Sequence, residues 1–345
     1  MRLSNLLLHF SVSLTGSIGV ANAAYSIQDT FDTSNFFNEF SFFTGSDPTN
    51  GFVSYVPAVS ANLSALAGYT SSAVYLGVDH TTINPSGGRR SVRVTSNKSY
   101  THGLFIADIA HMPDSTCGVW PAFWTFGPNW PTAGEIDIME GVNAQTTNSM
   151  TLHTSAGCTI TGTGAKYSSK LSNANCNAGN GNDGCSFSGA DTQGYGTGFN
   201  AVGGGIYAMD WTSSAINIYF FPRSSIPSDI TSGAPAPETW GSPVASFVGG
   251  SGCDIDTHFA NHNIVFNTDF CGDWAGNVWE SGSCAALAST CELYVAANPT
   301  AFRDAYWEIN SVKVYQDGGN STTIPSTTKR AVRTKREFRS VPFMA

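Results

Sequence analysis

Apolar and polar residues alternate with a period of two along much of the chain after residue 24, and helical periodicity is scarce. The clearest alternating segments are 91–96, 103–109, 135–142, 150–154, 206–211, 216–221, 263–267 and 306–315. Alternation over such lengths predicts β-strands, and clusters of Gly, Asn, Ser and Pro separate these segments. Many short strands joined by turns are typical of a sandwich or jelly roll. We therefore expect an all-β protein.

No break in composition divides residues 24–316, and no repeat of fixed period appears, so we expect a single domain. Residues 155–204 are rich in Gly, Ser and Asn and hold three cysteines, which predicts long loops clamped by disulfides. Residues 317–345 are rich in Ser, Thr and Pro and then basic. We expect a disordered tail there, with proteolytic trimming at a dibasic pair as the alternative.

The first 23 residues have the features of a secretion leader. Arg2 supplies the positive start, an apolar stretch begins at Leu6, and Ala21 and Ala23 fit the small-x-small cleavage pattern. Polar residues interrupt the apolar stretch, so a membrane anchor is the weaker interpretation. All eight cysteines follow this leader, which predicts up to four disulfides of undetermined pairing. We expect a secreted, extracellular protein that does not span a membrane.

The charge of the chain is unevenly distributed. The net charge is −9, but the tail 317–345 is positive, so the body carries about −14. An acidic body argues against nucleic acid as a partner, and a neutral polymer is a better candidate. Asn62, Asn97 and Asn320 begin glycosylation sequons. The motifs of serine hydrolases (Gly-x-Ser-x-Gly) and zinc proteases (His-Glu-x-x-His) are both absent from the sequence.

Residues 134–141 read Gly-Glu-Ile-Asp-Ile-Met-Glu-Gly and carry three acids on an apolar, strand-like segment. On a regular strand Glu135 and Asp137 share a face, and Glu140 points to the opposite one. A β-bulge near Ile138–Met139 would return Glu140 to the acidic face.

With such a bulge, the two outer carboxylates would lie roughly 5–6 Å apart, the separation expected of a retaining glycosidase. One carboxylate then attacks the sugar, and the other protonates the leaving oxygen. Asp137 between them could share a proton and tune their pKa values. The alternative is a solvent-facing cluster that binds calcium or forms salt bridges.

Over most of residues 25–316 the chain resembles glycoside hydrolase family 16, particularly the fungal endo-1,3(4)-β-glucanases called laminarinases. The motifs that carry this resemblance are Ser91-Val-Arg-Val, His102-Gly-Leu-Phe, His111-Met-Pro, Gly118-Val-Trp-Pro-Ala-Phe-Trp, Gly127-Pro-Asn-Trp-Pro, Gly134-Glu-Ile-Asp-Ile-Met-Glu-Gly-Val-Asn, Thr151-Leu-His-Thr, Met209-Asp-Trp, Phe220-Phe-Pro-Arg and Cys271-Gly-Asp-Trp-Ala-Gly. The six-residue Glu-x-Asp-x-x-Glu signature is similar to the laminarinase branch rather than to the bacterial lichenases.

The resemblance implies a β-jelly-roll sandwich of two antiparallel sheets whose concave face forms a glucan cleft. It also implies that Glu135 is the nucleophile, Glu140 the acid/base and Asp137 an assisting residue. His153, on the following strand, is implied to hydrogen-bond into this cluster, whereas a histidine at that position alone is more often structural. No cofactor is required for such chemistry. A structural calcium, present in relatives, has no recognisable ligand set in this sequence.

Tryptophans near the acids are candidates for binding the sugar rings. Indoles stack on the apolar C–H faces of sugars, which makes Trp124, Trp130 and Trp274 the expected substrate-binding residues. The resemblance places a stacking Trp at position 130. We expect Trp120, Trp211 and Trp307 in the core. Arg223 fits a structural ion pair as well as it fits a substrate contact.

The leading hypothesis is an endo-acting retaining hydrolase of β-1,3- and mixed β-1,3/1,4-glucan, which we expect to be a monomer. A cell-wall β-glucan transglycosylase is the first alternative, because it uses the same covalent intermediate. The absence of a lipid-anchor signal favours hydrolysis. A non-catalytic glucan-binding sandwich is the second alternative, but a binder has no need of mutually repelling, desolvated glutamates.

Overall fold

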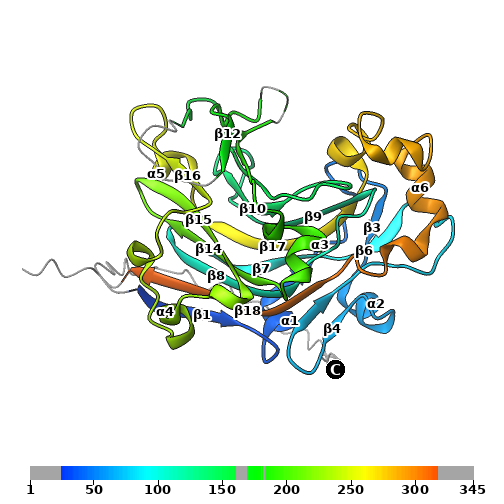
Figure 1. Cartoon of the computed structure of the whole chain (residues 1–345), viewed down its shortest axis with the longest axis horizontal. Coiled ribbons are helices and arrows are strands. Elements are labelled where there is room, and N and C mark those ends of the chain that lie inside the picture. Colours follow the sequence, from blue (N-terminus) through cyan, green and yellow to red (C-terminus); the bar gives the residue numbers. More distant parts are fainter. Residues whose placement is uncertain (1–24, 161–168, 180, 182, 318–345) are drawn as a thin grey trace, which may run out of the picture.

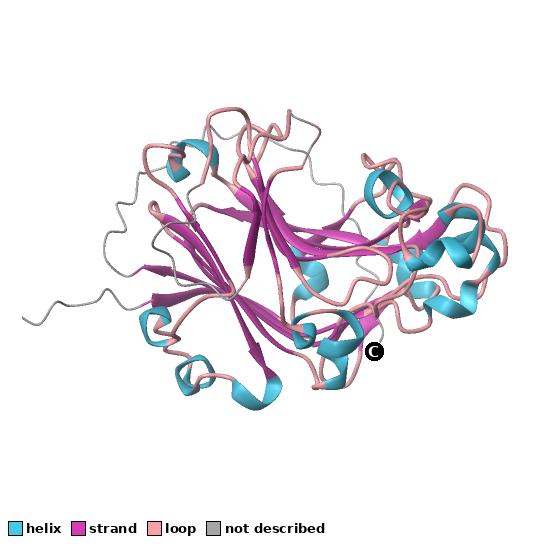
Figure 2. Cartoon of the chain, turned by 45° about the horizontal axis from the view of Figure 1, so that its top comes forward, coloured by secondary structure: helices cyan, strands magenta, loops and turns pink. Residues whose placement is uncertain are grey.

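Two large antiparallel sheets packed face to face make up the body of the protein, and short helices lie around their edges (Figures 1 and 2). The computed structural model describes residues 25–160, 169–179, 181 and 183–317. The expected leader, most of the basic tail and the Asn320 sequon lie outside the described residues. Within the described ranges, no helix is long and apolar enough to cross a membrane.

The first sheet has eight strands, and its centre is formed by strands from distant parts of the chain. Its order is β16 (Ala245–Val248), β15 (Ala215–Pro222), β14 (Gly205–Trp211), β8 (Gly103–His111), β18 (Trp307–Asp317), β5 (Val74–Leu76) and β4 (Ala67–Tyr69), and β1 (Tyr25–Phe31) also pairs with β18. The first and last described strands therefore lie side by side, which closes the domain.

The second sheet also has eight strands and carries the acidic motif. Its order is β12 (Lys170–Asn173), β13 (Cys185–Ser188), β11 (Ser149–His153), β10 (Glu135–Glu140), β9 (Val119–Phe126), β17 (His262–Phe270), β7 (Arg93–Tyr100) and β2 (Phe40–Phe42). Strands β3 (Val53–Tyr55) and β6 (Arg89–Ser91) form a separate parallel pair. In Figure 1, β10 and β9 lie near the middle of this sheet.

Short helical segments connect the strands. The α-helices are α1 (Phe36–Glu39), α2 (Ala58–Leu63), α3 (Gly196–Ala201), α4 (Ser228–Ser232), α5 (Ile255–His258) and α6 (Cys291–Ala297). The 3-10 helices are η1 (Thr192–Gly194), η2 (Arg223–Ser225), η3 (Pro237–Thr239), η5 (Ser283–Ala286) and η6 (Pro299–Phe302), and η4 (Gly272–Gly276) is a π-helix. All are short, which agrees with the scarcity of helical periodicity in the sequence.

The core lies between the two sheets and is rich in aromatic side chains. Phe123 of β9 stacks on Phe266 of β17, with ring centroids 4.4 Å apart. Trp307 packs edge-on against Phe266, and both Trp307 and Trp211 are fully buried. The prediction that Trp211 and Trp307 belong to the core is confirmed. Burial of such large apolar surfaces is the main favourable contribution to folding.

Every segment predicted to be a strand overlaps a strand of the structure, but the loop prediction for residues 155–204 is partly wrong. This segment contains β12, β13 and α3. Strand β13 pairs with β11, so these strands extend the second sheet at one edge. Both strands are only four residues long, which is too short for their alternation to stand out in the sequence, and pairing with neighbouring strands holds them in the sheet.

All eight cysteines are paired. The disulfides are Cys117–Cys284, Cys158–Cys253, Cys176–Cys185 and Cys271–Cys291. Two of them join residues more than 90 positions apart, which restricts the unfolded chain most strongly. Four disulfides are typical of proteins from an oxidising compartment.

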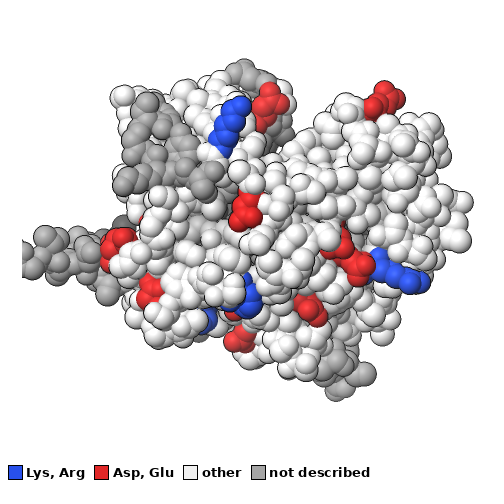
Figure 3. Space-filling view, viewed as in Figure 1, with Lys and Arg blue, Asp and Glu red and all other residues white. Residues whose placement is uncertain are grey.

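The surface is hollowed between two lobes on the face shown in Figure 3. One lobe lies around β12 and α5, and the other around α6, with β10 and β9 between them in the same view (Figure 1). Charged side chains are sparse and scattered on this face (Figure 3). The concave second sheet therefore offers a largely uncharged cleft.

Candidate active site

A β-bulge in β10 sets the directions of the three acids. Against β9, Asp137 pairs with Trp124 and Met139 with the adjacent Phe123, so Ile138 is the extra residue. Against β11, the register also shifts between Asp137 and Glu140. Ile138 and Met139 are both buried in the core. The bulge therefore lies where the spacing predicts it, and Glu140 returns to the side of Glu135 and Asp137.

The three carboxyl groups are desolvated and close enough to influence one another. Burial raises the pKa of Glu135, Asp137 and Glu140 to about 8 in each case. The charge of Asp137 further raises the pKa of both glutamates, and Glu140 further raises that of Glu135. Like charges in a low-dielectric site cannot all be ionised together, so the three groups share protons at neutral pH.

His153 lies beside the first two acids, as the hairpin predicts. It stands directly opposite Glu135 in the β10–β11 pair. Its Nε2 is 3.3 Å from Asp137 Oδ2 and 4.0 Å from Glu135 Oε1. His153 also lowers the pKa of both glutamates through its charge. Among the described residues, Asp137 Oδ2 and His153 Nδ1 have no partner with hydrogen-bond geometry, so this cluster keeps unused hydrogen-bonding capacity.

Trp120 is part of the site, and the prediction that it belongs to the core is wrong. Its indole Nε1 donates a hydrogen bond of 2.8 Å to Glu140 Oε1, which lowers the pKa of that carboxyl. Its side chain is only half-buried, whereas its neighbour Val119 is buried. Trp120 and Trp124 are four residues apart on β9 and so share the face of the sheet that carries the acids. This parity is the signal that sequence reasoning could have used.

The three tryptophans predicted to bind substrate all lie around the acids. Trp130 is 45% exposed, and its side chain lies close enough to Glu135 to lower the pKa of that carboxyl. Trp124 is half-buried, and its Nε1 donates to Asn267 Oδ1 at 2.7 Å. The guanidinium of Arg93 lies 4.8 Å from the Trp124 ring centroid, which restricts that indole further.

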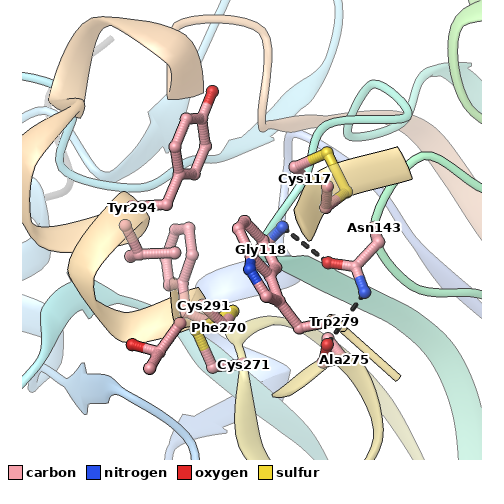
Figure 4. Close-up of a disulfide and its surroundings, with 12 residues drawn as sticks. Cys117, Gly118, Asn143, Phe270, Cys271, Ala275, Trp279, Cys291 and Tyr294 are labelled. Atoms are coloured by element: carbon pink, nitrogen blue, oxygen red, sulfur yellow. Dashed lines mark hydrogen bonds between the residues drawn. A yellow bond between two sulfur atoms is a disulfide. The ribbon is translucent and has the colours of Figure 1, made fainter. Parts of the chain in front are cut away.

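Trp274 lies on the π-helix η4 and contacts the site through Trp120. The two indoles meet edge to face at 5.7 Å. A disulfide from Cys271 to Cys291 of α6 holds the start of η4 (Figure 4). One more anchor was not recognised in the sequence: Asn143 accepts from the Gly118 backbone N–H and donates to the Ala275 carbonyl, both at 2.8 Å (Figure 4).

Arg223 has a structural role. Its Nη1 forms an ion pair of 2.7 Å with Asp108, and its other nitrogens donate to the carbonyls of Gly203 and Ile109. These partners belong to the first sheet and its turns rather than to the acid-bearing strand. Of the two interpretations of Arg223, the structure supports the ion pair.

Glu135, Asp137 and His153 offer ligand atoms that all lie within 4.8 Å of one another, which is compatible with holding a cation. However, the raised pKa values of the two carboxyls mean that protons compete for the same atoms.

The family model for the XgeA-like catalytic GH16 domain matches residues 40–315. The chain belongs to glycoside hydrolase family 16. A probable endo-1,3(4)-β-glucanase of Aspergillus fumigatus is 44% identical over 330 residues, which cover 91% of this chain and 50% of the relative. An endo-1,3(4)-β-glucanase of Arthroderma benhamiae is 44% identical over 332 residues, covering 94% of this chain and 71% of the relative. The chain thus spans about half the length of the Aspergillus relative.

Two solved family 16 structures are similar over most of this chain. One is laminarinase 16A from Phanerochaete chrysosporium with 6-O-glucosyl-laminaritriose in donor and acceptor sites, at 42% identity and a TM-score of 0.81. The other is an elongating family 16 β-1,3-glucosyltransferase, at 46% identity and a TM-score of 0.80. Each match covers 85% of this chain and 100% of the other. The same fold and a comparable degree of identity therefore accompany both hydrolysis and transfer.

Proposed function

We propose that this chain is an endo-acting retaining hydrolase of β-1,3- and mixed β-1,3/1,4-glucan, exported from the cell and active as a monomer. The observation that carries the proposal is the bulge in β10, which brings Glu135, Asp137 and Glu140 to one face of the concave sheet. The similarity to fungal endo-1,3(4)-β-glucanases supports the same substrate class.

In the first step, the Glu135 carboxylate attacks the anomeric carbon while Glu140 gives its proton to the departing glycosidic oxygen. In the second step, Glu140 takes a proton from water, and the resulting hydroxide equivalent displaces Glu135 from the sugar. The raised pKa of Glu140 lets it retain a proton near neutral pH, as the acid must. The pKa of Glu135 is raised to the same value, so the roles of the two glutamates are assigned from the family signature rather than from their pKa values.

Asp137 and His153 assist by sharing protons and charge with Glu135 and Glu140. Trp124, Trp130 and Trp274 form the stacking surfaces for the sugar rings around the scissile bond. Carboxylates supply both the nucleophile and the proton donor, so the reaction needs no cofactor. The sparsely charged face in Figure 3 supports a neutral polysaccharide rather than nucleic acid as the partner.

Digestion of laminarin, lichenan and a branched β-glucan tests the proposal. We expect a rapid fall in viscosity with new reducing ends, and NMR of early products should show the β-anomer formed first. The matched control is Glu135→Gln, which conserves volume and removes the nucleophile. The absence of new reducing ends with all three glucans would reject the hydrolase proposal.

A β-1,3-glucan transglycosylase is the second candidate. The similarity to the elongating glucosyltransferase, at 46% identity over 85% of the chain, favours it. In that reaction a sugar hydroxyl, rather than water, displaces Glu135 and gives its proton to Glu140. Incubation with laminari-oligosaccharides separates the two candidates, because products longer than the substrate accumulate with a transferase.

A further inference from the structure

The bulge in β10 leaves backbone groups without a partner from a neighbouring strand, and a side chain fills this position. Between Asp137 and Glu140, two residues of β10 face the single residue Met150 of β11. An extra residue of this kind disrupts the hydrogen-bond ladder locally. Buried peptide groups that lose their ladder partners need replacements.

Asn148, the residue before β11, supplies both replacements. Its Nδ2 donates to the Ile138 carbonyl at 2.9 Å, and its Oδ1 accepts from the Glu140 N–H at 2.8 Å. The side chain is almost completely buried, with 3% exposure. The amide thus takes the place of one peptide unit of β11, because it offers one donor and one acceptor to the same strand.

The orientation of this amide is determined by its partners. Turning it over would set its oxygen against the Ile138 carbonyl and its nitrogen against the Glu140 N–H, so only one orientation satisfies both groups. Asn148 is held in turn by its own carbonyl, which accepts from Gly189 N–H at 2.8 Å. The backbone of Glu140 is therefore fixed to the start of β11 and the end of β13 at the point where its side chain leaves the strand.

We propose that Asn148 is a positioning residue that keeps Glu140 on the cleft face by stabilising the bulge. This inference rests on the proposed function, because it assigns Asn148 to the delivery of the Glu140 proton. Without the amide, the extra residue can move along β10, and a shift of one position turns the Glu140 side chain to the opposite face.

Asn148→Ala tests this role on two substrates. On laminarin, we expect kcat to fall about 100-fold with KM changed less than about threefold, since misplacing a general acid costs roughly 10²–10⁴ in rate. On an aryl β-laminaribioside with a good leaving group, departure needs no proton, and the loss of kcat/KM, which reports the first step alone, should be less than about tenfold. Equal losses of kcat/KM on the two substrates, or unchanged kcat on laminarin, would overturn the proposal.

Asn200 provides a matched control. Its amide also bridges backbone groups, accepting from Met112 N–H at 3.0 Å and donating to the Met112 carbonyl at 2.8 Å, but it lies on α3 and also donates to Asp114 Oδ1 at 2.7 Å. Asn200→Ala should lower the melting temperature while leaving the ratio of the two substrates' kcat/KM values at the wild-type ratio. A changed ratio in this control would show that a general loss of stability is enough to alter the ratio between the two substrates, and the proposal would fail.

Asn148→Asp keeps the test decisive if the alanine variant does not fold. A carboxylate at this position still accepts from Glu140 N–H but repels the Ile138 carbonyl, whereas a protonated carboxyl can donate to that carbonyl. The titratable side chains beside this amide are Glu140 on β10 and Tyr207 on β14. We expect the activity relative to wild type at the same pH to rise as the pH falls.

If the activity of Asn148→Asp relative to wild type stays constant across the pH range, the positioning role is contradicted. Wild type is assayed first on both substrates, because a wild-type protein that cleaves neither would reject the proposed function itself. Cleavage by wild type together with a failed Asn148 series would reject only the positioning role.

Discussion

The second sheet carries two groups of buried carboxyls that are built differently. The first is Glu135, Asp137 and Glu140 on β10, hereafter the cleft acids. The second, hereafter the wall pair, is Asp269 on β17 with Asp47 from the loop that covers it. Burial raises the pKa of Asp269 well above its ordinary value, and the charge of Asp47 raises it further, as happens among the cleft acids.

The two groups differ in how their oxygens are satisfied. In the wall pair, Asp269 accepts from the Phe270 N–H at 2.6 Å and from the Thr49 hydroxyl at 3.0 Å. A side chain at Gly51 would collide with Asp269, because a Cβ there would lie 2.1 Å from Oδ1. Asp269 is therefore sealed from solvent, with 2% exposure, whereas Asp47 is half-buried.

The cleft acids keep unused hydrogen-bonding capacity. Asp137 Oδ2 lacks a hydrogen-bond partner among the described residues, and Glu135 is partly exposed. A raised pKa alone thus does not mark a catalytic group. Burial combined with unused hydrogen-bonding capacity facing a cleft does.

The largest expected effect separates the two groups directly. Glu135→Gln removes the nucleophile, so we expect kcat/KM on laminarin to fall at least about 10⁴-fold. Asp269→Asn keeps a hydrogen-bonding group of the same size in the wall pair and should leave kcat/KM within about twofold. Reducing-sugar assays on both purified variants check this, with circular dichroism to confirm folding. Comparable losses in the two variants would abolish the distinction.

Glu140→Ala should lower laminarin cleavage by about 10²–10⁴-fold, because the leaving sugar then departs without a proton. An aryl laminaribioside with a good leaving group should keep most of its kcat/KM, which reports the first step, whereas its kcat still falls because Glu140 also activates the water of the second step. Steady-state kinetics on the two substrates measure this difference. If kcat/KM on the aryl substrate falls as far as on laminarin, Glu140 is not the acid.

Asp137→Asn should lower kcat by about tenfold and move the pH profile toward lower pH. The charge of Asp137 raises the pKa of both Glu135 and Glu140, so removing it lowers both values. Glu135 then ionises at lower pH, which shifts the acidic limb of the profile downward. Glu140 also loses its proton at lower pH, which shifts the basic limb in the same direction. A kcat/KM profile from pH 3 to 9 tests this, and unmoved limbs would contradict the coupling.

Much of this architecture follows from local patterns. Alternation located the strands, and the five-residue interval from Glu135 to Glu140 predicted the bulge, because a strand of strict period two cannot place both side chains on one face. His153 followed from the hairpin that an adjacent strand must form with β10. These inferences work because the period of a strand is a property of its own backbone.

The rest depends on partners that are distant in sequence. Asn148 and Asn143 act through backbone groups of other segments, and no spacing marks an asparagine for such a role. The disulfide Cys117–Cys284 joins residues 167 positions apart, and four pairs allow many connectivities. Strand β13 forms by pairing with β11, and β12 forms by pairing with β13. Both pairings depend on the folded sheet rather than on a local pattern. The even spacing between Trp120 and Trp124 on β9 places both side chains on the cleft face, so the prediction that Trp120 belongs to the core overlooked a local pattern.

The smallest expected effect concerns stability and belongs to the wall pair. Because the pKa of Asp269 is raised in the folded state, the folded protein holds a proton that the unfolded chain releases near pH 4. The free energy of unfolding should therefore decrease as the pH rises above that value. Asp269→Asn imitates the protonated carboxyl and removes the part of this dependence that Asp269 contributes, whereas the cleft acids, whose pKa values are also raised, keep theirs. Its melting temperature should match wild type near pH 4 and exceed it by roughly 2–4 °C at pH 8.

Thermal unfolding followed by circular dichroism from pH 4 to 8 measures this difference. The exposed Asp183 provides the control, since Asp183→Asn should leave the pH dependence of wild type unchanged. If Asp269→Asn loses stability in parallel with wild type as the pH rises, the proton is not held by the wall pair. The cleft acids would then be the main carboxyls whose burial costs stability at high pH. In that case Asp137→Asn, rather than Asp269→Asn, should flatten the curve, because removing one cleft charge relieves the repulsion among the other two.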